Sequence, residues 1–246
     1  MTEDEESWVV VNNEAEEGGQ QTLNFTVKNN SAAGGVGVEF GYDAIRSVNE
    51  LVVATGLCNM SFRDVCGTLI AAADGSLILS KYAFDEVIRG LIPAESMDGE
   101  TRRRVSSVLS GVFYAFDRDG TATVNVLEFA SGFSVFCKGN KSDKLAFAFE
   151  SMDDDMDGRL SRRAMWRFAR AFLTVLIKVG AGGQEQDEEA FVDAVDGGAV
   201  WMAASVFGGR GGNKGVLFDE FAEWYTRSGY RENSWLELLD LRKWCL

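Results

Sequence analysis

The feature that most constrains this chain is a twelve-residue segment, Asp117 to Glu128, in which oxygen-bearing side chains recur at alternate positions and an acid stands at the end. A loop of this length wraps a calcium ion when oxygen ligands stand at positions 1, 3, 5, 7, 9 and 12. Position 7 uses its backbone carbonyl, and position 12 supplies both carboxylate oxygens. The residues at these positions are Asp117, Asp119, Thr121, Thr123, Asn125 and Glu128. The segment therefore predicts a Ca²⁺ site.

The residues around this segment indicate that it joins two helices. Leu109, Phe113 and Phe116 fall on one helical face before it, and Phe129 follows it directly. Position 6 of such a loop needs a left-handed backbone and is normally glycine, but here it is Ala122. That conformation costs an L-residue roughly 1–2 kcal/mol. We therefore expect the calcium affinity to be weakened rather than lost.

A second segment of the same type begins at residue 153, which is 36 residues after residue 117. Its oxygen ligands would come from Asp153, Asp155, Asp157, the carbonyl of Arg159, and Ser161. Gly158 occupies position 6, but position 12 is Ala164, so the acid that supplies two ligands is missing. Three aspartates with water suit Mg²⁺, which retains several waters when bound. A loop of this kind between two helices is an EF-hand, and two in tandem predict that fold.

The rest of the chain repeats the order of helix, short loop and helix in a more divergent form. Degenerate loops are expected at about 70–81 and about 209–220, and each should pair with one acidic loop through a short two-stranded ribbon. We therefore predict an all-α fold of four EF-hands in two lobes, 41–139 and 140–246, the second ending in an amphipathic helix. Residues 1–40 are acidic at their start and rich in glycine and asparagine, which predicts a flexible tail.

The composition excludes several classes of function. The net charge of −14 disfavours a nucleic-acid partner, because phosphate binding needs clustered lysine and arginine. The chain contains no histidine, which removes histidine-based catalysis and histidine-ligated zinc, and we predict that it is not an enzyme. It has no C-x-x-C pair, no signal-peptide pattern and no apolar run of ~18 residues. These features predict a cytoplasmic protein with no membrane span.

The central stretch resembles one group of EF-hand proteins. The resemblance is carried by Phe116-Asp-Arg-Asp-Gly120, Val124, Glu128-Phe129, Gly132-Phe-Ser-Val-Phe136, Lys138-Gly139 and Lys144-Leu-Ala-Phe-Ala-Phe149. These residues look like the calcineurin B subunits, and calcineurin B-like plant sensors, neuronal calcium sensors and calaxin-type flagellar proteins share the same plan. The resemblance is sharp over about 108–175. It implies four EF-hands in two lobes and an apolar groove that holds a helix of a target protein. It also implies regulation of a phosphatase, kinase, channel or motor component.

Two further segments bear on how a target would be bound. The helix that follows Ser161 is apolar around most of its surface, which predicts a core helix; lining of a binding groove is the alternative. The last segment, Trp235 to Trp244, is amphipathic. A helix docked on its own chain is the favoured interpretation, and a partner or dimer contact stays open. Thr2 stands where calcineurin B relatives carry a myristoyl glycine, so no lipid anchor is expected.

The leading hypothesis is a calcium-binding sensor that regulates a larger protein by holding one of its helices. A calcium-independent structural protein of the light-chain kind is the main alternative, because most of the loops are degenerate. A calcium buffer is a weaker alternative, since each of the two better loops has a defect at Ala122 or Ala164.

Overall fold

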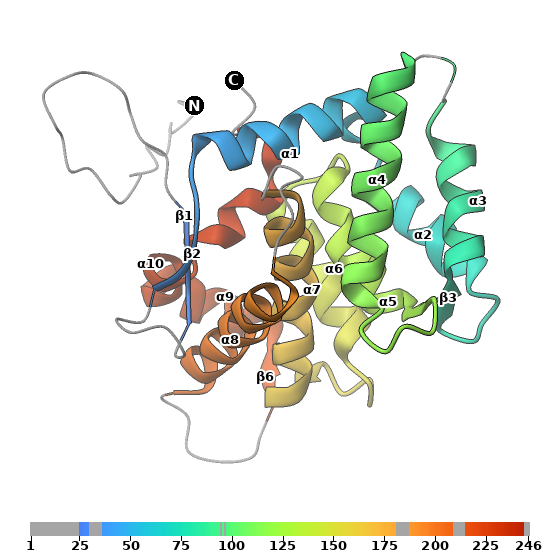
Figure 1. The fold of residues 1–246 in the computed structure, drawn as a ribbon. Coiled ribbons are helices and arrows are strands. Elements are labelled where there is room, and N and C mark those ends of the chain that lie inside the picture. Colours follow the sequence, from blue (N-terminus) through green and yellow to red (C-terminus); the bar gives the residue numbers. More distant parts are fainter. Residues whose placement is uncertain are drawn as a thin grey trace, which may run out of the picture.

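A computed structural model of the chain describes residues 25–29, 36–93, 95, 97–180, 187–208 and 215–243. This part is mostly helical, and its strands form three short two-stranded antiparallel sheets, which confirms the predicted all-α class with small ribbons. Figure 1 shows the helices gathered around α7 (Arg162–Gly180). α1 (Tyr42–Thr55) lies across one end of this assembly.

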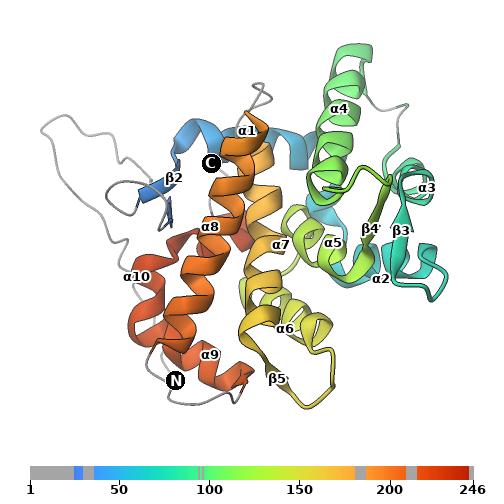
Figure 2. The same ribbon diagram turned by 60° about the horizontal axis from the view of Figure 1, so that its bottom comes forward.

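The first half of the molecule contains two helix–loop–helix units. Their helices are α2 (Phe62–Ala72), α3 (Lys81–Leu91), α4 (Gly99–Phe116) and α5 (Val126–Phe133). Between them β3 (Ile78–Ser80) lies antiparallel beside β4 (Thr123–Asn125), as Figure 2 shows. Residues 117–128, here called loop 2, are thus joined to the preceding loop through their ribbons.

The strand register fixes the span of that preceding loop. Leu79 lies opposite Val124, which is position 8 of loop 2. In paired loops of this kind the two position 8 residues face each other, so the preceding loop, here loop 1, spans 72–83. The predicted span of about 70–81 is therefore two residues too early. Leu77, Ile78 and Leu79 are all apolar, so the sequence alone does not tell which of these residues lies opposite Val124.

The second half repeats this arrangement. Its helices are α6 (Lys141–Met152), α7, α8 (Glu188–Phe207) and α9 (Phe218–Trp224), and its strands are β5 (Arg159–Leu160) and β6 (Val216–Leu217). Leu160 lies opposite Val216. This register gives loop 3 as 153–164 and loop 4 as 209–220, the spans expected from the sequence. Residues 209–214 of loop 4 lie outside the described residues.

Loops 1 to 3 end in the same way, with position 9 capping the helix that leaves the loop. Ser80, Asn125 and Ser161 each accept a hydrogen bond from a backbone N–H of the first turn, at 3.1, 3.1 and 3.2 Å. Such caps satisfy amide groups that have no partner inside the helix. The polar residue at position 9 therefore sets where each exiting helix begins.

The N-terminal segment departs from the predicted tail. β1 (Phe25–Lys28) and β2 (Val36–Phe40) form an antiparallel pair, and Phe25 and Val27 are buried where β1 packs against α8. The prediction of a flexible tail over 1–40 is wrong for these two strands. Phe25 and Val27 alternate with polar Thr26 and Lys28, which is the period-two pattern of a strand with one buried face. The acidic residues 1–24 lie outside the described residues.

α7 is buried on several sides, as its sequence predicted. α1, α4, α5 and α8 all pack against it, and Phe168 and Phe172 on α7 have no exposed surface. The two halves therefore share one continuous apolar core. α8 runs beside α7 in both ribbon views (Figures 1 and 2). By length and composition α8 is the one described helix that could cross a membrane, and 44% of its apolar stretch is buried in this core.

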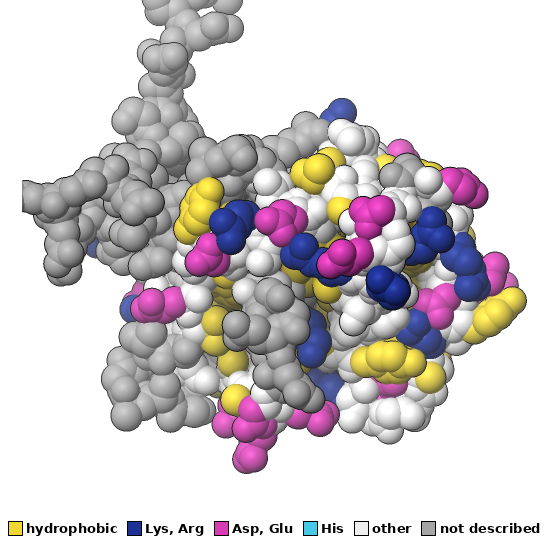
Figure 3. Space-filling view, turned by 45° about the horizontal axis from the view of Figure 1, so that its top comes forward, with side chains coloured by type: hydrophobic (Ala, Val, Ile, Leu, Met, Phe, Trp, Pro, Cys, Tyr) yellow, Lys and Arg dark blue, Asp and Glu magenta, His cyan; other side chains and the backbone are white. Residues whose placement is uncertain are grey.

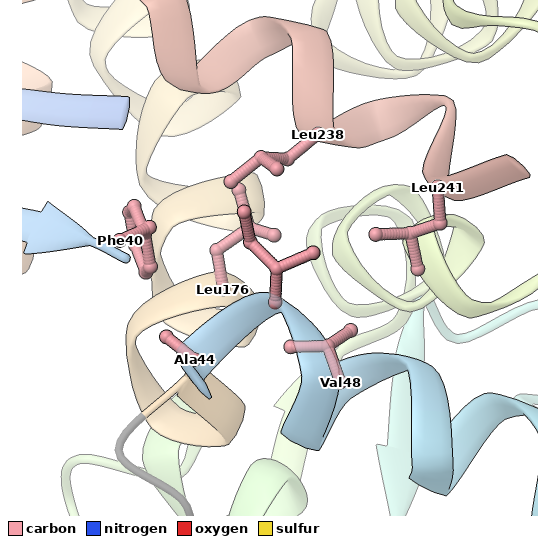
Figure 4. A pocket seen from close by; sticks show the side chains of 7 residues that line it. Phe40, Ala44, Val48, Leu176, Leu238 and Leu241 are labelled. Carbon is pink, nitrogen blue, oxygen red and sulfur yellow. The ribbon is translucent and has the colours of Figure 1, made fainter. Parts of the chain in front are cut away.

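The C-terminal segment lies on the core but is not the α-helix that its amphipathic pattern predicted. Ser234–Leu239 and Leu241–Lys243 form two 3₁₀ turns. Trp235, Leu236, Leu238 and Leu239 are all buried, so apolar contacts surround the segment instead of lying along one α-helical face. Figure 4 shows Leu238 and Leu241 directed toward Ala44 and Val48 of α1 and Leu176 of α7. The space between α1 and α7 is thus filled by the chain's own end.

Candidate metal centre

The loop backbones adopt the conformation that wraps a cation. Loop 2 has positive φ angles at positions 4 and 6, 68° at Gly120 and 55° at Ala122. Loop 3 has them at the same positions, 55° at Met156 and 76° at Gly158. In loop 1 the residues at these positions are Gly75 and Leu77, with φ angles of 73° and 59°. The backbone path is therefore shared by the three loops, whether or not the side chains supply ligands.

Four predicted ligands of loop 2 lie together. The Thr121 hydroxyl lies 2.8 Å from Asp119 Oδ1, 2.8 Å from Thr123 Oγ1 and 3.4 Å from Asp117 Oδ1. The two oxygens of Asp117 also accept the N–H groups of Thr121 and Ala122, at 3.0 and 2.9 Å. The hydrogen bond from Thr121 holds the pKa of the Asp119 carboxyl below its usual value. This end of the loop is a small, negatively charged cluster of oxygens.

The other two predicted ligands of loop 2 face elsewhere. Asn125 uses its side-chain oxygen to cap α5. Glu128 at position 12 meets α7 instead of the loop: Oε1 accepts from Arg167 Nε at 2.7 Å, and Oε2 lies 3.8 Å from Arg170 Nη2. The Glu128 side chain is only 13% exposed. Within the described ranges no three His, Cys, Asp or Glu side chains converge where they could hold a metal ion.

In loop 3, aspartate side chains accept hydrogen bonds from backbone N–H groups of the same loop. Asp153 Oδ2 accepts the N–H of Gly158 at 2.8 Å, and Asp157 Oδ1 accepts the N–H of Arg159 at 2.8 Å. Asp155 is exposed. The three aspartates that the sequence assigned to a metal therefore stand on one loop, and two of them already serve as acceptors.

The remaining predicted ligands of loop 3 have structural contacts. Ser161 caps α7, and Ala164 at position 12 is 6% exposed in the core. The guanidinium of Arg159 donates to Gly215 O at 2.9 Å and lies 3.6 Å from a carboxylate oxygen of Glu220. Glu220 is position 12 of loop 4. The position 12 acids of loops 2 and 4 are therefore both paired with arginines.

Known proteins of two kinds match part of this chain. Human calaxin is 30% identical over 89 residues, which is 36% of this chain and 40% of calaxin. The calcineurin B protein of Schizosaccharomyces pombe is 35% identical over 85 residues, 34% of this chain and 45% of the relative. The chain resembles the calcineurin B group of EF-hand proteins. The calcineurin B protein of Candida glabrata is 32% identical over 83 residues, 33% of this chain and 44% of the relative. The chain spans less than half the length of these relatives, and no family model matches it.

A calcium ion bound to this chain would find part of its ligand set arranged in loop 2. The side-chain oxygens of Asp117, Asp119 and Thr121 are close to one another, and Thr123 follows with its carbonyl at position 7. The fit is incomplete, because Glu128 is bound to arginines. Bound calcium would supply a charge that draws the position 12 carboxylate, and with it α5, toward the loop. Loop 3 offers no acid at that position.

Arg167 connects loops 2 and 3. While its Nε contacts Glu128, its Nη1 donates to both carboxylate oxygens of Asp154, position 2 of loop 3, at 2.9 and 2.7 Å. Burial alone would lower the pKa of Arg167, but hydrogen bonds to Asp154 and Glu128 outweigh burial and raise it. The guanidinium therefore stays charged between two carboxylates.

Arg170 is the second arginine beside Glu128, and its side chain is 18% exposed. Burial lowers the pKa of its guanidinium, and the nearby Glu128 carboxylate opposes that shift. Its guanidinium also lies 5.0 Å from the ring centre of Trp166, a cation–π contact. The charge of Arg170 is thus balanced by the carboxylates of Glu128 and Asp196 and by one aromatic face.

Sequence reasoning missed Arg167 and Arg170. The sequence does offer a signal for them, because they stand three residues apart in the middle of a helix whose other central residues are mostly apolar. A cation on such a helix needs a partner when it is carried into the core. Asp154 was missed because position 2 of an EF-hand loop is not a ligand position.

Proposed function

We propose that this chain is a calcium-responsive regulatory EF-hand protein that binds a helix of a larger protein in an apolar groove. Loop 2 carries the proposal, because its left-handed backbone at positions 4 and 6 accompanies a cluster of oxygen ligands at its start. The partner is a phosphatase, kinase, channel or motor component. The role is not enzymatic and the location is cytoplasmic. Calaxin and the calcineurin B proteins are the relatives that support this class of function.

The exposed apolar surface favours the half with loops 1 and 2 as the binding face. Of the large apolar side chains that are exposed in the described part, most belong to this half: Tyr42, Val53, Leu77, Ile78, Tyr82 and Tyr114. A partner helix would remove such side chains from water. Figure 3 shows acidic and basic side chains interspersed on the face that comes forward. Apolar contacts rather than one charged field would therefore define the fit on this face.

Titration calorimetry with Ca²⁺ and Mg²⁺ tests the calcium dependence. Asp119→Asn removes a loop 2 carboxylate without touching the contact of Glu128 with Arg167, and Asp157→Asn is the matched change in loop 3. The wild-type protein should bind calcium in the micromolar to roughly ten-micromolar range. We expect Asp119→Asn to weaken this binding about tenfold, because a charged ligand is lost, and Asp157→Asn to change it little.

Asp64→Asn controls for the loss of one negative charge, since Asp64 is exposed and lies outside all four loops. Its calcium affinity should equal that of the wild type. An absence of calcium heat in the wild type over this range would contradict the sensor function.

A calcium-independent structural protein is the second candidate. The observation that favours it is that the position 12 acids, Glu128 and Glu220, are paired with Arg167 and Arg159. Such a protein would bind its partner helix equally well in calcium and in chelator. A calcium-responsive protein would bind the same helix more tightly in calcium, so one affinity measurement under both conditions separates the two candidates.

A further inference from the structure

The Glu128 carboxylate has two cations as neighbours on α7. Arg167 Nε lies 2.7 Å from Oε1, and Arg170 Nη2 lies 3.8 Å from Oε2. Each oxygen thus faces one positive group, and the two guanidinium groups together carry the charge of one divalent ion. The position 12 carboxylate of loop 2 is therefore neutralised by the protein itself.

Burial makes these contacts stronger than a surface ion pair. The side chains of Glu128, Arg167 and Arg170 are 13%, 15% and 18% exposed. A partly buried carboxylate that lost its partners would be costly, and a charge pair out of water interacts more strongly than one in it. Glu128 therefore has a stable position away from the ligand cluster of loop 2.

The surrounding charges hold the two arginines in place. Arg167 also binds Asp154 of loop 3, whose side chain is 67% exposed. Arg118, position 2 of loop 2, forms a 2.5 Å ion pair with Asp196 of α8, and the charges of both lie within the electrostatic reach of Arg170. Three carboxylates and three guanidinium groups thus join loop 2, loop 3 and α8.

We propose that Arg167 and Arg170 act as internal counter-cations that compete with calcium for Glu128 and so set the calcium affinity of loop 2. This inference rests on the proposed calcium site in loop 2. Calcium bound by Asp117 and Asp119 gains Glu128 only when that carboxylate leaves the arginines. The exchange frees Arg167 from one of its two carboxylates and thereby links occupancy of loop 2 to the position of loop 3.

Calcium calorimetry on arginine variants tests the competition. Arg167→Gln removes the charge while keeping a polar side chain of similar length, and Arg170→Gln does the same at the second contact. We expect each variant to bind calcium about tenfold more tightly than the wild type, because calcium no longer displaces a cation from Glu128. Arg163→Gln is the matched control: Arg163 is an exposed arginine of the same helix, and that variant should keep the wild-type affinity.

A second variant guards against a folding defect. Arg167→Lys keeps the positive charge but lacks the planar fork that contacts Glu128 and Asp154 together. Its calcium affinity should fall between those of the wild type and Arg167→Gln. Without calcium, Arg167→Gln should also unfold at a lower denaturant concentration than the wild type, and calcium should restore more of its stability than it adds to the wild type.

The outcomes separate this inference from the proposed function. Calcium binding of equal strength by the wild type, Arg167→Gln and Arg163→Gln would overturn the competition and leave the proposed calcium site standing. Binding by Arg167→Gln but not by the wild type would support the competition and contradict a calcium-responsive wild-type protein. An absence of calcium binding by every variant would overturn both.

Discussion

Within loop 2, the least favourable backbone conformation belongs to Ala122. Its φ angle is 55°, and its N–H is donated to Asp117 Oδ2 at 2.9 Å. The hydrogen bond holds the residue in the left-handed region that a Cβ atom disfavours. Loop 3 has a similar residue, Met156, with the same φ of 55° and a side chain that is 88% exposed. The other loop has glycine at the matching position in each case: Gly158 is position 6 of loop 3, as Ala122 is of loop 2, and Gly120 is position 4 of loop 2, as Met156 is of loop 3.

Replacement of Ala122 by glycine should stabilise the protein. Ala122→Gly removes the left-handed strain, and we expect the free energy of unfolding to rise by about 1 kcal/mol after the greater freedom of glycine in the unfolded chain is included. Chemical denaturation in the presence of a chelator measures this change in the free energy of unfolding. Met156→Gly is the matched change and should give a similar gain. A loss of stability in Ala122→Gly would show that the alanine methyl group makes contacts that outweigh the strain.

Among the helices, α2 packs against α5, and a movement of α5 would disturb this contact. Cys66 on α2 donates to the carbonyl of Ala130 on α5 at 3.2 Å. Burial raises the pKa of the Cys66 thiol well above its usual value, and burial raises that of Cys137 to about 12. Both therefore stay protonated at pH 8, and the reactive thiolate forms only where the contact opens.

Alkylation of Cys66 should report calcium-driven movement of α5. At pH 8 in chelator we expect Cys66 to react far more slowly than the partly exposed Cys58, which serves as an internal reference. Saturating calcium should speed the reaction of Cys66 severalfold if α5 follows Glu128 toward the loop. Mass spectrometry of the separated peptides gives both rates. Equal Cys66 rates in calcium and in chelator, with loop 2 loaded, would exclude an opening of the α2–α5 contact.

The C-terminal segment is fastened to α6 by a buried lysine. Lys144 is 1% exposed, and its Nζ donates to Leu239 O at 2.7 Å and to Val135 O at 3.4 Å. Closer to the surface, Glu237 of the same segment is an ion-pair partner of Lys141 and accepts a 2.6 Å hydrogen bond from Tyr225. Polar contacts on α6 thus complement the apolar ones on α1.

Loss of the Lys144 ammonium group should destabilise the protein. In Lys144→Met the carbonyls of Leu239 and Val135 lose a donor inside the core, and we expect a cost of about 1–3 kcal/mol in the free energy of unfolding. Lys141→Met provides a comparison, because its ion pair is nearer to water and should be worth less. Urea denaturation of both variants measures the difference. Equal losses would mean that burial of Lys144 adds nothing to the strength of its contacts.

Across the whole molecule, the features that could be predicted are those marked by local spacing. For loop 4, Glu220 marks position 12, and the predicted span agrees with the pairing of Leu160 and Val216; loop 1 was misplaced because no acid marks its end. The ligand residues of loop 2 were predicted from the same kind of spacing. The attachment of Glu128 to Arg167 depends on how α7 packs against α5, and such a contact between distant residues leaves no spacing in the sequence. The 3₁₀ turns that begin at Ser234 depend equally on the surfaces against which they pack.

One core runs through both halves, and the C-terminal segment covers a part of it between α1 and α7. Leu238 and Leu241 face Ala44, Val48 and Leu176 there (Figure 4). Removal of residues 234–246 should expose this apolar surface without any need for calcium. We expect an apolar dye to fluoresce more strongly with the shortened chain than with the full chain in chelator.

The matched control is removal of residues 244–246 alone, which keeps the two 3₁₀ turns and should leave the dye signal near that of the full chain. A synthetic peptide of residues 234–243 added to the shortened chain should lower the signal again, because it restores the same contacts. Circular dichroism checks that the shortened chain keeps its helices. An unchanged dye signal in a folded shortened chain would mean that α1 closes onto α7 when the segment is gone. In that case the segment would not be what keeps this surface from water.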